Sequence, residues 1–275
     1  MSNVMIINYN LCNGCYNCQI ACKDEHVAND WSPIAKPQPD TGQFWHKIHD
    51  NVRGQVPKVF VTYEHTMCQH CEDAPCIDAC KSKAIYQRED GAVIIDPTIC
   101  KGNRLCIEAC PYDEVIYYNK DLDICQKCTF CAHLLDDGWK EPRCVDACPT
   151  GAMIFGDEND PEIKKLLEEA SPLNPELGIK PRVFYIGLPK RFIAGAVYDE
   201  VKDECIEGAK IVCENKETGE TKEVSTDNFG DFWVRGLENG VYKLTFIADG
   251  YKEMVVEADV TERDLNVGDF ALEAK

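Results

Sequence analysis

The chain has no long apolar run, and its 29 lysine and arginine residues are outnumbered by 48 aspartate and glutamate residues. Because a membrane helix needs about 20 mainly apolar residues, we expect no direct membrane insertion and attachment only through a partner. The segment MSNVMIINYN has neither the basic nor the apolar stretch of a secretory signal, which favours a cytoplasmic location.

Basic residues are too few to form a phosphate-binding face, so the formal charge of −19 argues against nucleic acid as a partner. The acidic surface is either simply solvated or steers the chain toward a basic partner, because net charge governs association rather than fold. The sequence also lacks a Ser-His-Asp arrangement, a phosphate loop and a paired-carboxylate pattern. We therefore expect a non-catalytic subunit, with the substrate chemistry in another chain.

Cysteine is nearly absent from the last part of the chain: sixteen of the eighteen cysteines precede residue 150, and only Cys205 and Cys213 follow it. The composition therefore predicts two domains, residues 1–189 and residues 190–275, of which the first is rich in metal ligands. A disulfide framework is the alternative, but it needs an oxidising compartment and is typical of small secreted domains.

The early cysteines form four groups with short, repeated spacings. In the first group the spacing is C-x2-C-x2-C-x3-C, which is the pattern of bacterial ferredoxins. In such a run three thiolates from one loop bind one cluster, and the last cysteine ligates another cluster. Zinc is the competing metal, since two C-x2-C pairs also make a tetrahedral site, but zinc sites do not require a triplet followed by C-x3-C-P. The groups are Cys12, Cys15, Cys18 and Cys22; Cys68, Cys71, Cys76 and Cys80; Cys100, Cys106 and Cys110; and Cys125, Cys128, Cys131, Cys144 and Cys148.

Several longer stretches resemble the electron-transfer beta subunits of molybdopterin oxidoreductases of the dimethyl sulfoxide reductase family. The resemblance implies an α+β fold of two ferredoxin-like modules wrapped around iron–sulfur clusters. It also implies a heterodimer with a large catalytic subunit that alone holds molybdopterin. The stretches are CKDEH, CQHCEDAPC, DGAVIIDPTIC, CIEACPYD, KCTFC, GWKEPRCVDACPTGA and RVFYIGLP.

In that family the first cysteine group pairs with the fourth, and the second pairs with the third. Carried over to this sequence, the resemblance implies three complete [4Fe-4S] ligand sets. The first set is Cys12, Cys15, Cys18 and Cys148; the second is Cys22, Cys128, Cys131 and Cys144; the third is Cys68, Cys71, Cys76 and Cys110.

A fourth set would use Cys80, Cys100 and Cys106, but Asn103 stands where its fourth thiolate belongs. Four outcomes are open at this degenerate site: a [3Fe-4S] cluster, substitution by Cys125, weak ligation by the Asn103 oxygen, or no cluster at all. Cys125 lies only three residues before Cys128, which another cluster would hold in place, so we expect loss of the cluster. The prediction is three [4Fe-4S] clusters.

Two residues near these groups have simple structural roles as alternatives to metal binding. His70 lies inside CQHC, where four thiolates already serve the group, so a hydrogen bond to a sulfur or a carbonyl is expected rather than ligation. Tyr112 follows the C-x3-C-P run and is expected to cover a cluster.

From residue 192 onward, short alternating runs are separated by turn signals such as DNFG and ENG. About seven strands in some eighty residues suggest a β-sandwich. The order GAVYD, GAKIVC and STDNFGDFWVRGLENGVYKLTFIADGY resembles the carboxypeptidase regulatory-like, or prealbumin-like, domain. A docking or stabilising module is expected. Before it, DPEIKKLLEE predicts a short helix capped by Asp160, with Ile163, Leu166 and Leu167 on one face.

Three functional hypotheses follow. The first is an electron-transfer subunit of a molybdenum enzyme; the second is a free polyferredoxin-type carrier; the third is a structural scaffold folded by its clusters. The large insertions and the additional domain argue against a free carrier.

Overall fold

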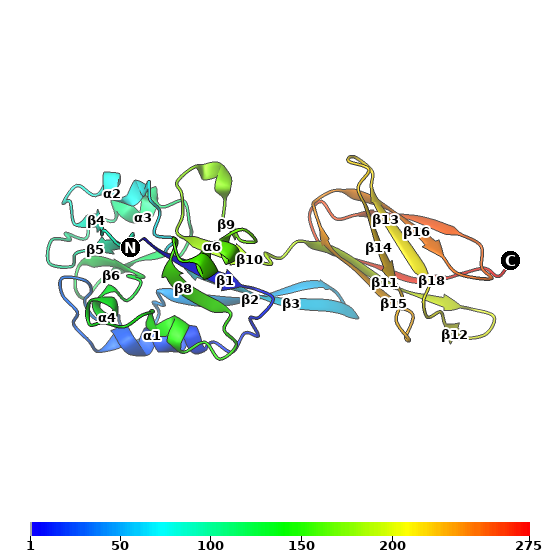
Figure 1. Cartoon of the computed structure of the whole chain (residues 1–275), viewed down its shortest axis with the longest axis horizontal. Helices are drawn as coiled ribbons and strands as arrows, with labels where there is room; N and C mark the ends of the chain where they lie inside the picture. The colour runs from blue at the N-terminus through cyan, green and yellow to red at the C-terminus, as the bar shows by residue number, and fades with distance from the viewer. Residues whose placement is uncertain (1) are drawn as a thin grey trace. The chain divides into compact units, whose positions relative to one another are not determined.

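The computed structural model describes residues 2–275 and divides into two compact units (Figure 1). The N-terminal unit comprises Met1–Asp50 and Tyr63–Leu188. The C-terminal unit comprises Asn51–Thr62 and Pro189–Lys275, so the outer part of an early hairpin belongs with the end of the chain. Each unit has its own hydrophobic core.

A four-stranded sheet lies at the centre of the N-terminal unit, in the order β8-β1-β10-β9. Strand β1 (Asn3–Asn8) runs parallel to β10 (Val183–Ile186) and antiparallel to β8 (Met153–Asp157), while β9 (Ser171–Pro172) lies at one edge. Met5 and Ile7 of β1 face the cysteine-rich core, because side chains alternate along a strand. The other face of β1 packs against the helix near residue 163.

Short hairpins and short helices surround this sheet and carry the cysteine loops. The hairpins are β2 (His46–Gln55) with β3 (Lys58–Met67), β4 (Ile85–Gln87) with β5 (Val93–Ile95), and β6 (Ile116–Asn119) with β7 (Ile124–Lys127). The helices are α1 (Asn17–Val27), α2 (Pro75–Ala79), α3 (Leu105–Ala109), α4 (Ala132–Asp136), α5 (Arg143–Asp146) and α6 (Pro161–Leu167), followed by the 3-10 turn η1 (Pro175–Leu177).

The helix predicted after Asp160 is confirmed as α6. The Asp160 carboxylate accepts a hydrogen bond of 2.8 Å from the backbone N–H of Glu162, and Pro161 occupies the first turn, where its missing N–H costs nothing. Ile163 is buried, and Leu166 and Leu167 pack beside it against β1, as the spacing of these residues predicts.

The C-terminal unit is a β-sandwich. One sheet has the order β12-β11-β15, with β18 parallel to β11, and the other has the order β14-β13-β16-β17. Inward-facing residues such as Val197, Phe232, Leu244 and Phe246 form its core. The strands are β11 (Arg191–Asp199), β12 (Glu204–Cys205), β13 (Lys210–Asn215), β14 (Thr221–Ser225), β15 (Asp231–Leu237), β16 (Val241–Ile247), β17 (Met254–Asp259) and β18 (Leu265–Ala271).

Within this unit, a buried ion pair fixes the hairpin tip to the sandwich. Both Arg53 Nε and Nη2 donate to the Asp264 carboxylate at 2.8 Å, and Asp264 also accepts from the backbone N–H of Phe192. The Asp264 side chain is only 3% exposed. The two partners therefore depend on each other, since either charge alone would be buried without compensation.

We expect Arg53→Met to lower the free energy of unfolding of the C-terminal unit by about 3–5 kcal/mol, because the Asp264 carboxylate would remain buried and unpaired. The control is Lys190→Met, which removes an exposed pair with Glu238 and should cost less than about 1 kcal/mol. Urea unfolding of the full chain, followed by circular dichroism, measures both. Equal effects of the two substitutions would contradict the assigned role of Arg53.

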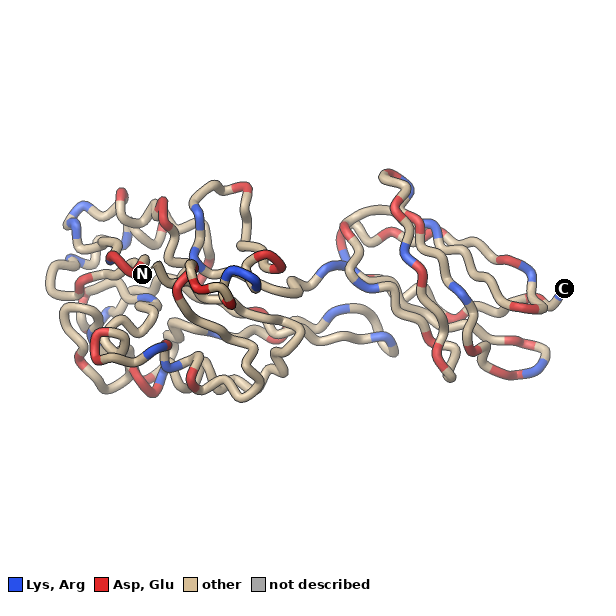
Figure 2. Tube along the Cα trace, in the orientation of Figure 1, with Lys and Arg blue, Asp and Glu red and all other residues tan. Residues whose placement is uncertain are grey.

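Within residues 2–275, no helix is long and apolar enough to cross a bilayer; the longest, α1, has 11 residues. Figure 2 shows acidic residues along both units, interspersed with lysine and arginine. The negative charge is thus a property of the whole chain and not of one segment.

Candidate iron–sulfur centres

Four cysteine loops share one backbone conformation. In each loop the second residue after the leading cysteine has a positive φ: 68° at Gly14, 47° at His70, 59° at Gly102 and 52° at Phe130. This conformation is uncommon for bulky residues and strains the backbone at His70 and Phe130. Its recurrence shows that the loop around Gly102 keeps the common shape although it lacks a cysteine at position 103.

In each loop this conformation turns a backbone N–H toward the sulfur of the leading cysteine. His70 N donates to Cys68 Sγ, and Phe130 N donates to Cys128 Sγ, both at 3.4 Å. The amides of Gly14 and Gly102 make the equivalent bonds to Cys12 and Cys100. Amides that converge in this way stabilise thiolates, and hydrogen bonds to the sulfurs are one of the features that set cluster potentials.

Helix packing brings the loops together in two pairs. Helix α1, which follows the first group, packs against α5 of the fourth group, and α2 of the second group packs against α3 of the third. This is the pairing that the family resemblance implies. It places cysteines from distant parts of the chain side by side.

The first set of thiols is gathered near the N-terminus of α1. Burial, and then the charges of Cys12, Cys148 and Cys15, raise the pKa of Cys18 to about 12. Thiols influence one another in this way only when they lie close together.

The second set lies between α1, α4 and α5 and is fully buried. Burial raises the pKa of Cys144 well above its usual value, and Cys131, Cys22 and Cys128 add to the effect. Cys18 of the first set also contributes, so the two sets are neighbours.

The third set lines a small cavity that opens in part to solvent. Burial, followed by the charges of Cys68, Cys110 and Cys76, raises the pKa of Cys71 to about 12. Tyr112 lines the same cavity, and its hydroxyl donates to the carbonyl of Leu173 at 3.2 Å, which holds the ring over the thiols.

These sets form a row, with the degenerate site at one end. The first and second sets are adjacent, because the charge of Cys18 raises the pKa of Cys144. The second and third sets are adjacent, because the charge of Cys68 raises the pKa of Cys128. The charge of Cys106, in the degenerate site, raises the pKa of Cys76 in the third set. The substitution at position 103 therefore affects the end of the row and leaves the first three sets adjacent to one another.

Asn103 itself turns away from the degenerate site. Its side chain is exposed, and Oδ1 accepts a hydrogen bond of 3.3 Å from the backbone N–H of Leu105. Asp123 lies beside the loop, since a side chain at Gly102 would meet its carboxylate at 2.3 Å. The asparagine oxygen is thus hydrogen-bonded within its own turn.

Cys125 occupies the space between the remaining thiols of this site. Its side chain is hydrogen-bonded to those of Cys100 and Cys106, and its backbone N–H donates to Cys100 Sγ at 3.4 Å. The bond from Cys125 lowers the pKa of Cys100 to about 5 and also lowers that of Cys106, while the pKa of Cys125 is raised. Burial raises the pKa of thiols such as Cys18, Cys71 and Cys144 in the other three sets, although hydrogen bonds lower that of Cys148.

Histidines lie beside two of the complete sets. His26 Nε2 is 3.8 Å from Cys131 Sγ, and its ring stands edge-on to His133, which in turn contacts Glu25 at 3.0 Å. His70 accepts at Nδ1 from the backbone N–H of Val93 at 2.9 Å and stacks on Phe130. The prediction that the His70 side chain bonds to a sulfur or a carbonyl is therefore wrong: its ring accepts from a backbone amide, and only the backbone N–H of His70 donates to a sulfur, that of Cys68.

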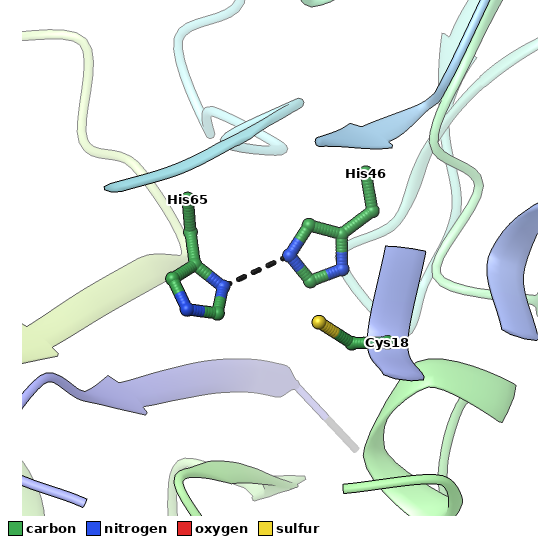
Figure 3. Close-up of side chains that lie close together, drawn as sticks. All are labelled: Cys18, His46 and His65. Atoms are coloured by element: carbon green, nitrogen blue, oxygen red, sulfur yellow. Dashed lines mark hydrogen bonds between the residues drawn. The ribbon is translucent and has the colours of Figure 1, made fainter. Parts of the chain in front are cut away.

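A further histidine pair lies at the first set (Figure 3). His65 Nε2 is 3.4 Å from Cys12 Sγ, and His65 Nδ1 is 3.0 Å from His46 Nε2. Both side chains are almost completely buried, and one nitrogen of each ring lies within 4.8 Å of Cys18 Sγ. Burial lowers the pKa of His65 to about 4, so the ring is neutral at neutral pH.

Lys127 is a buried cation next to the second and third sets. Its side chain is 2% exposed, and Nζ donates to the carbonyls of Val93 and Cys128. Within residues 2–275, no carboxylate forms a salt bridge with it. Its positive charge instead works to lower the pKa values of Cys76, Cys110 and Cys128, against the effect of burial. A buried ammonium group needs compensating negative charge, and the thiolates are the available source.

Comparisons with known proteins agree with this arrangement. Residues 59–158 match the 4Fe-4S dicluster domain family, and residues 193–273 match the carboxypeptidase regulatory-like domain family. The chain is 39% identical over 265 residues to the pyrogallol hydroxytransferase small subunit of Pelobacter acidigallici, which covers 93% of this chain and 94% of that protein. It is 34% identical to a subunit of the tetrathionate reductase of Salmonella typhimurium, with coverage of 69% and 74%. This protein belongs to the iron–sulfur subunit family of molybdopterin oxidoreductases. The iron–sulfur subunit of the arsenate respiratory reductase of a Shewanella species is 31% identical, with coverage of 66% and 94%.

The residues of this iron–sulfur subunit fit the group that the family implies. Each complete set offers four thiols with amide donors aimed at the leading sulfur, and the third set also encloses a cavity. Sequence reasoning did not identify His26, His46, His65 or Lys127 as part of these surroundings. Their partners lie far away in the sequence, as with the separation of 53 residues between His65 and Cys12. Spacing patterns carry no signal for such contacts.

Proposed function

We propose that this chain is the iron–sulfur electron-transfer subunit of a heteromeric molybdopterin enzyme, with pyrogallol–phloroglucinol transhydroxylase as the specific candidate. In that enzyme, hydroxyl transfer between phenols would take place at molybdenum in the large subunit. The observation that carries the proposal is the 39% identity to the pyrogallol hydroxytransferase small subunit, which extends over both units of the chain. The tetrathionate and arsenate reductase subunits cover at most 69% of this chain.

The proposal assigns twelve cysteines to three [4Fe-4S] clusters. Clusters of this kind supply one-electron transfer, with potentials set by charge, hydrogen bonding and exposure. The three sets are adjacent in a row, which supports their use as a single path. The ligands are Cys12, Cys15, Cys18 and Cys148; Cys22, Cys128, Cys131 and Cys144; and Cys68, Cys71, Cys76 and Cys110.

The degenerate site is proposed to hold no cluster. Cys125 fills the space between Cys100 and Cys106 with direct hydrogen bonds, whereas the four ligand sulfurs of a cubane are held apart by iron and sulfide. Cys80 is buried, and its sulfur lies 3.5 Å from the Ser82 hydroxyl. Cys80 is proposed to pack as a small apolar group at the end of the row, whereas Cys125 holds Cys100 as a thiolate.

The chain's own residues have three roles in this function. Burial of most of the ligand thiols excludes water from the clusters. The strained loops hold backbone amides against the leading sulfurs, and Lys127 places a positive charge between two sets. The amide donors and the Lys127 cation favour the more negative, reduced form of a cluster, because they face the charge that increases on reduction, whereas burial disfavours that form.

The proposed partner is a large molybdopterin-binding catalytic subunit in a cytoplasmic heterodimer. The domain assignment is residues 1–189 for two ferredoxin-like modules and residues 190–275 for the prealbumin-like sandwich, except that Asn51–Thr62 belongs with the C-terminal unit. The sandwich is proposed to dock or stabilise the assembly, because its turns carry no recognisable catalytic arrangement.

Co-expression with the proposed large subunit tests the function. We expect a much larger, molybdenum-containing chain to co-purify with this one, and reduction of the clusters to change the molybdenum spectrum. A stable monomer that exchanges electrons with several unrelated redox enzymes would instead identify a free carrier. A complex whose molybdenum spectrum and activity are unaffected by cluster reduction would identify a scaffold.

We expect Cys100 to be the first thiol alkylated by iodoacetamide in a Cys205→Ser background, which removes an exposed thiol. Because the pKa of Cys100 is lowered to about 5 by Cys125, the reactive thiolate is fully formed above about pH 6 and is lost below pH 5. The alkylation rate should therefore be level between about pH 6 and pH 8. Mass spectrometry of the native protein measures the adduct, and complete protection of Cys100 would show that its sulfur binds a metal.

A further inference from the structure

The buried histidine pair at the first ligand set has a geometry that cysteine ligation alone does not explain. His46 lies on β2 and His65 on β3, so the hairpin places the two rings next to each other, and Figure 3 shows the Cys18 sulfur close to them. The ring centroids are 5.2 Å apart, and Tyr9 packs edge-on against His65 at 5.8 Å. The exposed fractions are 1% for His46 and 4% for His65. Polar groups buried to this degree are expected to be hydrogen-bonded.

The directions of the hydrogen bonds that join His46, His65 and Cys12 follow from Cys12, which is the last acceptor in the series. A neutral imidazole has one N–H donor and one acceptor nitrogen. If Cys12 is a thiolate ligand it can only accept, so His65 must carry its hydrogen on Nε2, 3.4 Å from the sulfur. His65 Nδ1 is then an acceptor, and His46 Nε2, 3.0 Å away, must be the donor. Within residues 2–275, His46 Nδ1 has no hydrogen-bond partner, and in this assignment it is the nitrogen without a hydrogen.

We infer that His65 donates a hydrogen bond to the Cys12 sulfur and thereby raises the reduction potential of the cluster held by Cys12, Cys15, Cys18 and Cys148. His46 is the positioning residue, since its N–H fixes the tautomer and the orientation of His65. This inference rests on the proposed function, because it requires a cluster at that set.

The alternative for the same atoms is a mononuclear metal ion bound by Cys18, His46 and His65, whose ligand atoms lie within 4.8 Å of one another. Two observations favour the hydrogen-bonded series. His46 Nε2 and His65 Nδ1 are at an ordinary hydrogen-bond distance from each other, and the remaining nitrogen of His65 is directed at Cys12. In addition, Cys18 belongs to the first thiol set.

The test compares His65→Leu, His65→Gln and His46→Leu in the full complex by redox titration followed by EPR. His65→Leu removes the donor and should lower the equilibrium constant for reduction of one cluster about tenfold, which is about 59 mV for one electron. The other two potentials should stay unchanged. His65→Gln retains an N–H donor and should restore at least part of the shift, and His46→Leu should lower the same potential by a smaller amount. His49→Leu is the matched control, because His49 lies on the same strand as His46 but is only partly buried and faces Glu114 rather than a thiol, and it should change none.

Iron and zinc contents measured on the same samples separate the outcomes. Unchanged potentials in His65→Leu with unchanged iron would overturn the inference and leave the proposed function intact. Loss of about four irons in both His65→Leu and His65→Gln would overturn it by showing that His65 is a ligand. Loss of a single zinc or iron ion in either histidine variant would overturn it in favour of the mononuclear site. A wild-type complex without clusters would refute the proposed function itself.

Discussion

Replacing Cys110 by serine should remove about four of about twelve irons per chain, because this cysteine completes the third cluster and each cubane contains four irons. Cys110 belongs by sequence to the loop of the degenerate site, but its thiol lies with those of Cys68 and Cys71 in one cavity. The packing of α2 against α3 produces this exchange of ligands between loops. Iron and acid-labile sulfide measured in the purified complex give the result.

The matched control is Cys106→Ser, four residues earlier, on the short helix α3 that ends just before Cys110. Cys106 is hydrogen-bonded to Cys125 and is not assigned to a cluster, so its replacement should leave the iron content at about twelve. If Cys106→Ser lost as much iron as Cys110→Ser, the degenerate site would hold a cluster. If Cys110→Ser kept all its iron, the exchange of ligands between the loops would be wrong.

Replacing Lys127 by methionine should lower the free energy of unfolding of the cluster-loaded protein by about 3–5 kcal/mol, the usual cost of removing one member of a buried charge pair. The reason is that Lys127 has no carboxylate salt bridge within residues 2–275, while its charge reaches thiols of two sets. The potential of the third cluster should also fall, since the reduced form loses a nearby cation. The measurements are the thermal stability of the anaerobic complex and the redox titration of its clusters.

Lys101→Met is the control for this substitution. It removes the same charge from an exposed position on the loop after Cys100 and should change neither property appreciably. The apo chain provides a second comparison, because there Lys127 faces neutral thiols and its burial is not offset. Lys127→Met should therefore stabilise the apo chain relative to the wild type. Destabilisation of both forms by the same amount would indicate that Lys127 acts through packing alone.

Much of the fold follows from local sequence signals. The Asp160 cap and the proline after it fix α6, and alternating runs between turn residues account for β11, β13, β15 and β16 in the sandwich. The association of Asn51–Thr62 with the C-terminal unit has no such signal. It depends on Arg53 meeting Asp264 across 211 residues, and no local pattern relates two such positions.

The features of the candidate site can likewise be divided into those that the sequence predicts and those that it does not. Cysteine spacing locates the four loops because cluster ligation imposes a short repeat, and Gly14 and Gly102 stand where the loop needs a positive φ. His70 and Phe130 take that conformation without being glycine, so residue type alone does not reveal it. The position of Cys125 between Cys100 and Cys106 depends on how hairpin β6–β7 packs, which explains why the sequence left four outcomes open at Asn103.

The count of iron and acid-labile sulfide per chain in the anaerobically purified complex, together with EPR of the oxidised protein, tests the central claim most directly. Three [4Fe-4S] clusters and an empty site at Asn103 predict about twelve irons and no [3Fe-4S] signal. About sixteen irons, or about fifteen irons with a [3Fe-4S] signal, would contradict the account by showing a cluster at the degenerate site.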